Sequence, residues 1–103
     1  MATVLIVEDH RDTREFFARA FKVLGSQRIV CAKTGEEAVL KVREERPQVM
    51  ILDIMLPDMH GREVLRRARE IDPSLDVVVV TGHGDVQLSF EMGREGVAAF
   101  LEK

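Results

Sequence analysis

The sequence predicts a doubly wound α/β domain built on a five-stranded parallel sheet. Two patterns point to this class of fold. Five short runs rich in β-branched residues alternate with longer amphipathic segments. The runs are almost continuously apolar, which is typical of parallel strands that are buried on both faces. The chain of 103 residues has the length of one small domain and shows neither an internal repeat nor a low-complexity segment.

Each apolar run has the length of a strand, and the first, third and fourth runs are the most continuously apolar. The five expected strands are residues 3–7, 28–32, 48–53, 76–81 and 97–101.

The segment after the first strand has the pattern of an amphipathic helix. Its apolar residues recur at i, i+1, i+4, i+5 and i+8, which places them on one stripe. Gly25 is expected to end this helix. The residues of the stripe are Phe16, Phe17, Ala20, Phe21 and Leu24.

Two further helices have clear boundaries in the sequence. The second is expected to start at Thr34 or Gly35 and must end before Pro47, because the residue before a proline disfavours helical backbone. The third is expected to end at Asp72 and Pro73. Their inward residues are Ala38, Val39 and Val42 in the second helix, and Val64, Leu65, Ala68 and Ile71 in the third.

The fourth helix is expected within residues 84–96, and its composition makes it the weakest of the set. It contains Ser89 and Gly93, which are poor helix formers. A chain that stops at Lys103 supplies four helices for five strands, so the pattern lacks a final helix. The expected domain is therefore residues 1–103, ending after the fifth strand without its C-terminal helix.

Composition and charge exclude several classes of function. The formal net charge is −3, which argues against direct binding of nucleic acid or of an anionic membrane, because such surfaces require concentrated positive charge. The single cysteine, Cys31, cannot form an internal disulfide and is most simply a small buried residue. The N-terminus lacks the basic leader of a signal peptide. A cytoplasmic protein is expected.

Polar residues end four of the expected strands. Glu8 and Asp9 follow the first strand, and Asp53 ends the third. Thr81 ends the fourth strand, and Lys103 follows the fifth. Since the carboxyl ends of parallel strands meet at one edge of the sheet, where ligands bind in such folds, these side chains are expected on one rim.

This set of side chains suits phosphoryl chemistry on a carboxylate. Three clustered carboxylates repel one another, and a hard divalent cation such as Mg²⁺ relieves that repulsion. The charges of one Mg²⁺ and of Lys103 would balance the three carboxylates. A carboxylate can then act as the nucleophile that forms an acyl phosphate, and the Thr81 hydroxyl can donate to a phosphoryl oxygen.

The rim residues lie in segments that resemble a known family, the receiver domain of two-component response regulators. The resemblance covers essentially all 103 residues. It is specific because four segments occur in the family's order, whereas any one alone would be a weak signal. The segments are "VLIVEDH", "ILDIMLPDMHG", "VVVVTGHGD" and "VAAFLEK".

The resemblance implies a flavodoxin-like strand order, 2-1-3-4-5, and an acceptor site. Asp53 would accept a phosphoryl group from a histidine of a sensor kinase. Asp9, Asp53 and the backbone carbonyl of Met55 would bind Mg²⁺ or Mn²⁺, and Glu8 would assist through a water molecule. The domain would catalyse only its own phosphorylation and dephosphorylation, so it is expected not to be an enzyme in the ordinary sense.

The resemblance also implies a switch. Thr81 and Lys103 would contact the phosphoryl oxygens, and Phe100 would rotate inward when Thr81 moves toward the phosphate. Pro57 and Gly61 match the family's loop after the acceptor. The segment around Thr81 most resembles receivers attached to transcription activators, which suggests a C-terminal output domain that binds DNA in the parent protein.

Simpler structural roles exist for the same residues. Asp53 taken alone could be a solvated carboxylate, and Glu8 and Asp9 could be acids placed near a helix N-terminus. Thr81 could cap a helix, and Phe100 could be a core residue. A lysine in the position of Lys103 is usually a frayed, solvated charge.

The histidines show no metal-ligand spacing. They are His10, His60 and His83, and all are expected in loops. We expect His83 and Met55 to tune how fast water removes the phosphoryl group.

Two other functions compete with the phosphorylated switch. The first is an interaction module with the same fold that is never phosphorylated, which the intact set of acceptor residues disfavours. The second is a phosphohydrolase or nucleotide-binding enzyme. No glycine-rich phosphate-binding sequence follows the first strand, and Met55 occupies the place where a hydrolase would carry a second acid. Self-association through the sheet face left open by the missing helix is also expected.

Overall fold

The structure is a computed structural model that describes residues 2–25, 27–82, 91 and 93–102. The described residues form a five-stranded sheet in the order β2-β1-β3-β4-β5, with every neighbouring pair parallel. The predicted fold class and strand order are confirmed. The strands are β1 (Ala2–Val7), β2 (Gln27–Ala32), β3 (Val49–Asp53), β4 (Asp76–Thr81) and β5 (Ala99–Glu102).

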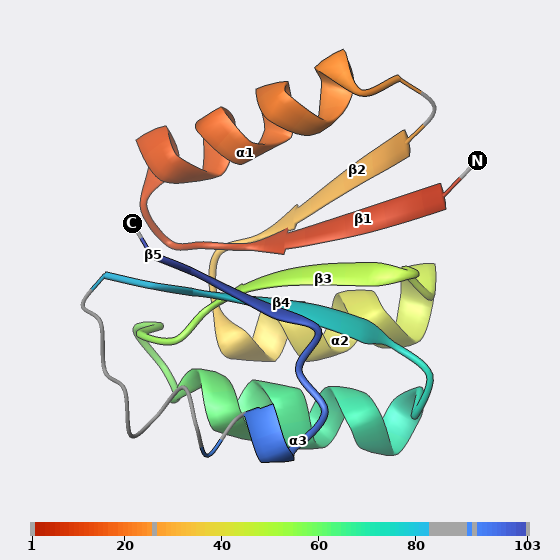
Figure 1. Ribbon diagram of the computed structural model, residues 1–103, viewed down its shortest axis with the longest axis vertical. Coiled ribbons are helices and arrows are strands. Elements are labelled where there is room, and N and C mark those ends of the chain that lie inside the picture. The colour runs from red at the N-terminus through yellow and green to blue at the C-terminus, as the bar shows by residue number, and fades with distance from the viewer. Residues whose placement is uncertain (1, 26, 83–90, 92, 103) are drawn as a thin grey trace.

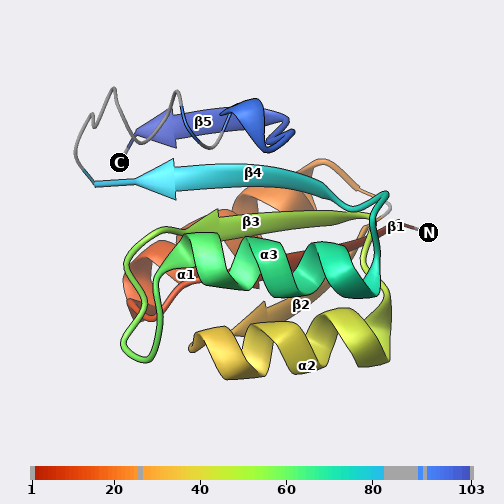
Figure 2. The same ribbon diagram turned by 90° about the horizontal axis from the view of Figure 1, so that it is seen from below.

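The helices cover the two faces of the sheet unequally. Figure 1 shows α1 (Arg11–Val23) on one face, and α2 (Gly35–Glu45) and α3 (Gly61–Ile71) side by side on the other. Figure 2 shows that α3 lies next to β3 and that α2 lies toward β2. The structure thus has three layers, as expected when right-handed crossovers distribute helices over both faces.

The larger part of the hydrophobic core lies between the sheet and the pair α2 and α3. It contains Leu5, Leu52 and Val79 from the strands and Val42 and Val64 from the helices, all with almost no exposed surface. The core on the α1 side is smaller, with Val4, Ile6, Ile51 and Val80 buried. Strand residues alternate between these two cores, which explains why the strands read as continuous apolar runs.

The predicted boundaries of α2 and α3 are confirmed. The Thr34 side chain accepts a hydrogen bond from Glu37 N at the start of α2, and the backbone of Arg46 ends that helix in the left-handed region with φ of 47°. At α3, His60 Nδ1 accepts from Arg62 N, and Asp72 is the C-cap. The polar side chains thereby satisfy backbone donors that the first helical turn leaves unpaired.

The prediction for α1 is partly wrong. Phe17 and Phe21 pack against the sheet together with Ala18, as one edge of the predicted stripe requires. Phe16 and Leu24 are exposed instead, and Phe16 retains 66% of its surface. The face of α1 that packs is therefore turned away from the centre of the apolar stripe.

Three further predictions concern residues 83–103. Residues 83–90 and 92, which include most of the predicted fourth helix and His83, lie outside the described residues, as does Lys103.

Within the part of the chain that is described, no helix combines the length and apolarity needed to cross a bilayer.

Candidate functional site

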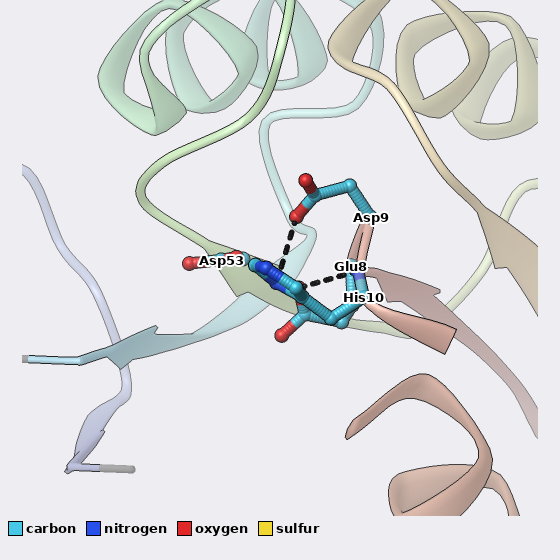
Figure 3. A group of neighbouring side chains, drawn as sticks. All are labelled: Glu8, Asp9, His10 and Asp53. Carbon is cyan, nitrogen blue, oxygen red and sulfur yellow. Dashed lines mark hydrogen bonds and ion pairs between the residues drawn. The ribbon is translucent and has the colours of Figure 1, made fainter. Parts of the chain in front are cut away.

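The carboxyl ends of the strands form one edge of the sheet and bring the predicted acids together. Glu8 and Asp9 directly follow β1, and Asp53 is the last residue of β3, the neighbour of β1. Figure 3 shows these side chains with His10 above the strand ends. One ligand atom from each of the four residues lies within 4.8 Å of the others. The predicted acidic rim is thus present.

Two of the carboxylates at the rim are almost completely buried. Glu8 retains 2% and Asp53 4% of its accessible surface. Glu8 Oε2 accepts a hydrogen bond of 3.2 Å from His10 N, and Asp53 Oδ1 accepts one of 3.3 Å from Met55 N. Burying two carboxylates side by side is unfavourable unless positive charge compensates them.

The third carboxylate at the rim, Asp9, is under-satisfied. Its Oδ1 atom is inaccessible to solvent and accepts no hydrogen bond from the described residues. Clustered carboxylate oxygens with spare lone pairs are the ligands that Mg²⁺ and Mn²⁺ prefer. The residues present therefore fit a hard divalent cation.

Arg14 supports the chain that carries these acids. Its Nη1 donates to the backbone carbonyl oxygen of Glu8 at 3.0 Å, and to that of Asp9 at 3.5 Å. Because the guanidinium contacts the carbonyls, it fixes the turn between β1 and α1 without neutralising the carboxylates directly. The role of Arg14 was not predicted from the sequence. The sequence indicates it only through the position of Arg14 on the first turn of the helix that follows the acids.

The loop after Asp53 is anchored at both of its ends. Gly61 N donates to the carbonyl oxygen of Ile54 at 2.7 Å, which closes the loop over the end of β3. A Cβ atom at Gly61 would lie 2.8 Å from Ile54 Cα, so a side chain does not fit there. The Met55 side chain points outward, with 70% of its surface exposed, two residues after Asp53.

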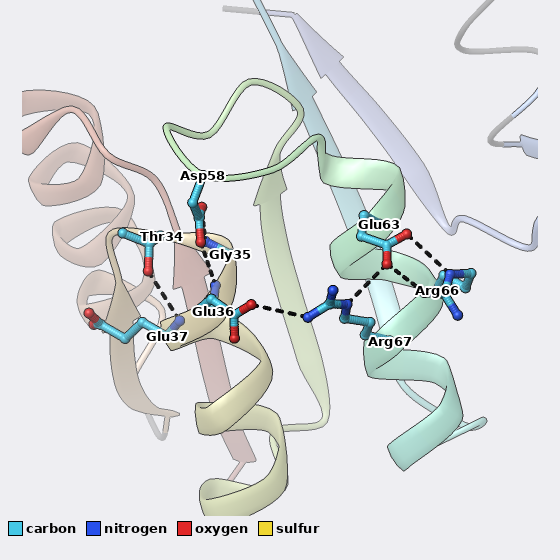
Figure 4. A network of polar contacts seen from close by, with 8 residues as sticks. All are labelled: Thr34, Gly35, Glu36, Glu37, Asp58, Glu63, Arg66 and Arg67. Carbon is cyan, nitrogen blue, oxygen red and sulfur yellow. Dashed lines mark hydrogen bonds and ion pairs between the residues drawn. The ribbon is translucent and has the colours of Figure 1, made fainter.

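The tip of this loop is bound to the start of α2. Figure 4 shows Asp58 above that helix, where its two oxygens accept from Gly35 N at 2.7 Å and from Glu36 N at 2.9 Å. With Thr34 accepting from Glu37 N, side chains satisfy the first three backbone donors of α2. Sequence reasoning missed Asp58, because its partners are 22 and 23 residues away.

Two effects act on the pKa of Asp58. Partial burial alone would raise it, but the backbone N–H groups of Gly35 and Glu36, with those of Asp58 and Met59, outweigh burial and lower the pKa below its ordinary value. Away from the site, burial raises the pKa of the Cys31 thiol, which is consistent with the interpretation of Cys31 as a small packed residue.

The remaining predicted site residues follow the same edge. The backbone of Thr81 ends β4 one residue after Val80, the register partner of Asp53. The backbone of Phe100 lies in β5 opposite Val79. The side chains of Thr81 and Phe100 are outside what the structure describes, and so is the whole of Lys103.

His10 belongs to the acidic cluster, although the histidines show no metal-ligand spacing in the sequence. Its Nδ1 lies 3.3 Å from Glu8 Oε2 and 3.2 Å from Asp9 Oδ1. The sequence contained one indication of this position, because His10 directly follows the two acids at the end of a strand. His60 lies in a loop as expected, where it caps α3.

Comparison with known proteins gives a consistent result. The family described as "Response regulator receiver domain" matches residues 4–103. The response regulator receiver protein CpdR of Brucella abortus is 35% identical over 103 residues, which are all of this chain and 85% of that protein. The response regulator GacA of Pseudomonas protegens is 33% identical over 104 residues, covering all of this chain and 49% of that protein.

Solved structures agree with the curated relatives. A response regulator receiver domain protein from Clostridium thermocellum superimposes with a TM-score of 0.92 at 25% identity, over all of this chain and 82% of that one. The response regulator domain of Thermotoga maritima CheB has a TM-score of 0.91 at 27% identity, over all of this chain and 78% of that one.

Proposed function

Because the chain belongs to the family of response regulator receiver domains, we propose that it is a phosphorylation-controlled signalling switch with Asp53 as its phosphoryl acceptor. The single observation that carries this proposal is the burial of Asp53 and Glu8 beside Asp9 at one edge of the sheet. A chain keeps such a repulsive set of charges for a ligand that compensates them.

The reaction proposed at Asp53 is a phosphoryl transfer. A carboxylate oxygen of Asp53 forms the new bond to phosphorus while the bond from phosphorus to the histidine nitrogen of a sensor kinase breaks. The electron pair of that bond stays with the imidazole, which takes up a proton, and Asp53 becomes an acyl phosphate. The hydrogen bond from Met55 N to Asp53 Oδ1 helps to fix the orientation of the carboxylate.

A divalent cation, Mg²⁺ or Mn²⁺, would be held by Asp9, Asp53 and the backbone carbonyl of Met55, with Glu8 acting through water. When bound, it stabilises charge on the phosphoryl oxygens. The Oδ1 atom of Asp9, which is inaccessible to solvent and accepts no hydrogen bond from the described residues, supports this assignment.

The switch proposed for this chain involves Thr81 and Phe100. Thr81 would donate its hydroxyl to a phosphoryl oxygen, Lys103 would pair with the same group, and Phe100 would follow Thr81 inward. The register supports the pairing of these roles, since Thr81 lies next to the partner of Asp53 and Phe100 lies on the adjacent strand. The output is a changed binding surface rather than a reaction on another substrate.

The partners we propose are a sensor histidine kinase and a C-terminal output domain, for a domain that acts in the cytoplasm. Relatives of this chain include a transcriptional regulatory protein of Mycobacterium tuberculosis, TcrX, of which it covers 36%, and the regulatory protein DctD of Pseudomonas aeruginosa, of which it covers 21%. A longer parent protein that binds DNA would fit these relatives. The net charge of −3 makes this domain itself a poor ligand for DNA.

Self-association is a further part of the proposal. Leu101 is the register partner of Val80, so the two side chains share the sheet face on which α1 lies. Leu101 retains 45% of its surface, and Phe16 on α1 is also exposed. Apolar side chains exposed on one face favour association between copies.

The deciding experiment is intact mass spectrometry after incubation with Mg²⁺ and acetyl phosphate. We expect one phosphoryl adduct on the wild type, none on Asp53→Asn, and none when a chelator removes the cation. Asp76→Asn is the matched control, because Asp76 is an exposed carboxylate at the opposite end of β4. It should be labelled like the wild type.

Absence of the adduct under every condition would contradict the acceptor role. It would favour the alternative that the domain is an interaction module that works without phosphorylation. An adduct that persists in Asp53→Asn would place the acceptor elsewhere.

A further inference from the structure

The carboxylates at the rim account for a magnesium site without His10, although the imidazole Nδ1 is within hydrogen-bonding distance of Glu8 Oε2. We propose that His10 Nδ1 is a nitrogen ligand of the divalent cation held by Glu8, Asp9 and Asp53, so that this site prefers first-row transition cations such as Zn²⁺ and Co²⁺ to Mg²⁺. This inference deepens the proposed function and rests on it, because it concerns the cation of the same acceptor site.

The position of the imidazole is the first argument. His10 is the N-cap residue of α1, yet its side chain makes no capping hydrogen bond. At α3 the corresponding residue is His60, whose Nδ1 does cap its helix by accepting from Arg62 N. The His10 imidazole is turned toward the acids instead, as Figure 3 shows, although 72% of the side chain is exposed and could reach solvent.

The distances between ligand atoms are the second argument. Zn²⁺ bonds of about 2.0–2.1 Å in a tetrahedron separate neighbouring ligand atoms by roughly 3.3–3.4 Å. His10 Nδ1 lies 3.3 Å from Glu8 Oε2 and 3.2 Å from Asp9 Oδ1. His10 Nδ1 therefore lies at the distance of a neighbouring ligand from both carboxylate oxygens, and one ligand atom from each of the four residues lies within 4.8 Å of the others.

The unpartnered oxygen of Asp9 is the third argument. Asp9 Oδ1 is inaccessible to solvent and accepts no hydrogen bond from the described residues. It is the same atom that lies closest to His10 Nδ1. A cation bound between the two would supply the positive charge that this oxygen lacks.

The nitrogen ligand decides which cations the site prefers. Mg²⁺ takes oxygen ligands almost exclusively and keeps several of its waters. Zn²⁺ and Co²⁺ bind imidazole well, and a mixed set of imidazole and carboxylates suits them better than carboxylates alone. Removing His10 should therefore weaken transition cations selectively.

The test is a comparison of cation affinities by calorimetry on the wild type, His10→Ala and His60→Ala. We expect His10→Ala to lower the affinity for Zn²⁺ at least about tenfold and to leave that for Mg²⁺ within a factor of about three. His60→Ala removes another exposed histidine, one that lies outside the acidic cluster, and should change neither affinity. As a second readout, Co²⁺ should give visible absorption bands that depend on His10, and the imidazole nitrogens of His10 should shift in NMR spectra on addition of Zn²⁺.

Each outcome separates this inference from the proposed function. If Zn²⁺ and Mg²⁺ affinities fall equally in His10→Ala, or neither changes, the inference is wrong while phosphorylation of Asp53 can still stand. If the selective loss is seen but the protein takes no phosphoryl group, the cation site is correct and the proposed function fails. Retention of Zn²⁺ binding in an Asp9→Asn, Asp53→Asn double variant would place the cation elsewhere and overturn the inference.

Discussion

Gly61 holds the acceptor loop in a shape that no other residue permits. Its position leaves no space for a Cβ atom, which would lie 2.8 Å from Ile54 Cα and 3.0 Å from the carbonyl oxygen of Asp53. Both of these are backbone atoms at the end of β3, so they cannot yield as a flexible side chain would. The geometry of Asp53 is thus coupled to the start of α3.

Gly61→Ala should therefore disturb the acceptor as well as the fold. We expect the free energy of unfolding, measured with urea, to fall by about 1–3 kcal/mol and the phosphorylation of Asp53 to slow. Gly82→Ala is the control, because a Cβ atom at Gly82 would meet no atom of the described residues within 4 Å. Equal losses in the two variants would contradict this explanation.

Asp58 should make the stability of the domain depend on pH. Asp58→Ala removes two acceptors from the N-terminus of α2 and should cost about 0.5–1 kcal/mol at neutral pH. Since the folded-state pKa of Asp58 is lowered, its contribution is complete above the ordinary aspartate pKa of about 4. It is lost as the pH falls through the lower folded-state value.

Urea denaturation of the wild type and Asp58→Ala at several pH values measures this effect. The difference in the free energy of unfolding should be largest at neutral pH and shrink as the pH falls below the ordinary aspartate pKa of about 4. Asp58→Asn keeps one acceptor oxygen and should lie between the two. A difference that stays constant over this range would show that the carboxylate charge does not matter.

The residues of the site differ in how far the sequence could predict them. Glu8, Asp9 and Asp53 could be predicted because strand ends and parallel topology alone decide where they lie. Asp58 and His10 could not, since their roles depend on where a loop and a helix start come to rest in three dimensions. A hydrophobic pattern carries no information on such contacts.

At the scale of the elements, α3 is the point of attachment for the segment that precedes β5. Arg62 pairs with Glu91 at 3.1 Å and with Glu95 at 2.6 Å. Arg69 donates to the backbone carbonyl oxygens of Glu95 and Gly96. Polar contacts on the surface thus hold this segment, and such contacts are weak individually.

Arg62→Ala should loosen that segment without unfolding the domain. We expect amide hydrogen exchange at residues 93–96 to accelerate by roughly two- to fivefold, while the thermal midpoint changes little. Arg66→Ala is the control, because among the described residues Arg66 pairs only within α3, with Glu63 and Glu70. Unchanged exchange in Arg62→Ala, or equal acceleration in the control, would contradict the attachment.

The helix α1 shows where periodicity stops being sufficient. At 100° per residue, the packed positions Phe17, Ala18 and Phe21 centre roughly 70° from the middle of the predicted stripe. The predicted apolar stripe of α1 is wider than the part of the helix that packs against the sheet. Periodicity alone therefore does not determine which edge of the stripe faces the sheet. Helices α2 and α3 were predicted correctly because caps fix their ends and narrow stripes fix their inward faces.

At the scale of the whole molecule, the sheet could be predicted almost completely. Five almost continuously apolar runs indicate a sheet buried on both faces, and the helical segments between them are long enough for the crossovers that parallel pairing needs. What remains to be tested is how the molecule uses its less covered face, on which Leu101 and Phe16 are exposed.

Sedimentation at increasing protein concentration measures the self-association proposed above. We expect the average mass to rise with concentration, and Leu101→Asp to hold the protein closer to the monomer by adding charge to the sheet face. Leu40→Asp is a suitable control, because Leu40 is exposed to a similar extent on α2, on the opposite side of the sheet. A strictly monomeric mass at the highest concentration would contradict self-association.

The exposed position of Met55 is suitable for a fluorescence probe of the site. The protein contains no tryptophan and no tyrosine, so its own fluorescence is almost silent. Met55 is solvent-facing, yet its backbone N–H lies 3.3 Å from the acceptor oxygen. A single indole placed there by Met55→Trp would stand beside Asp53 without entering the core. Fluorescence from that one indole would then report cation binding and phosphoryl transfer in real time, with almost no fluorescence from the rest of the protein.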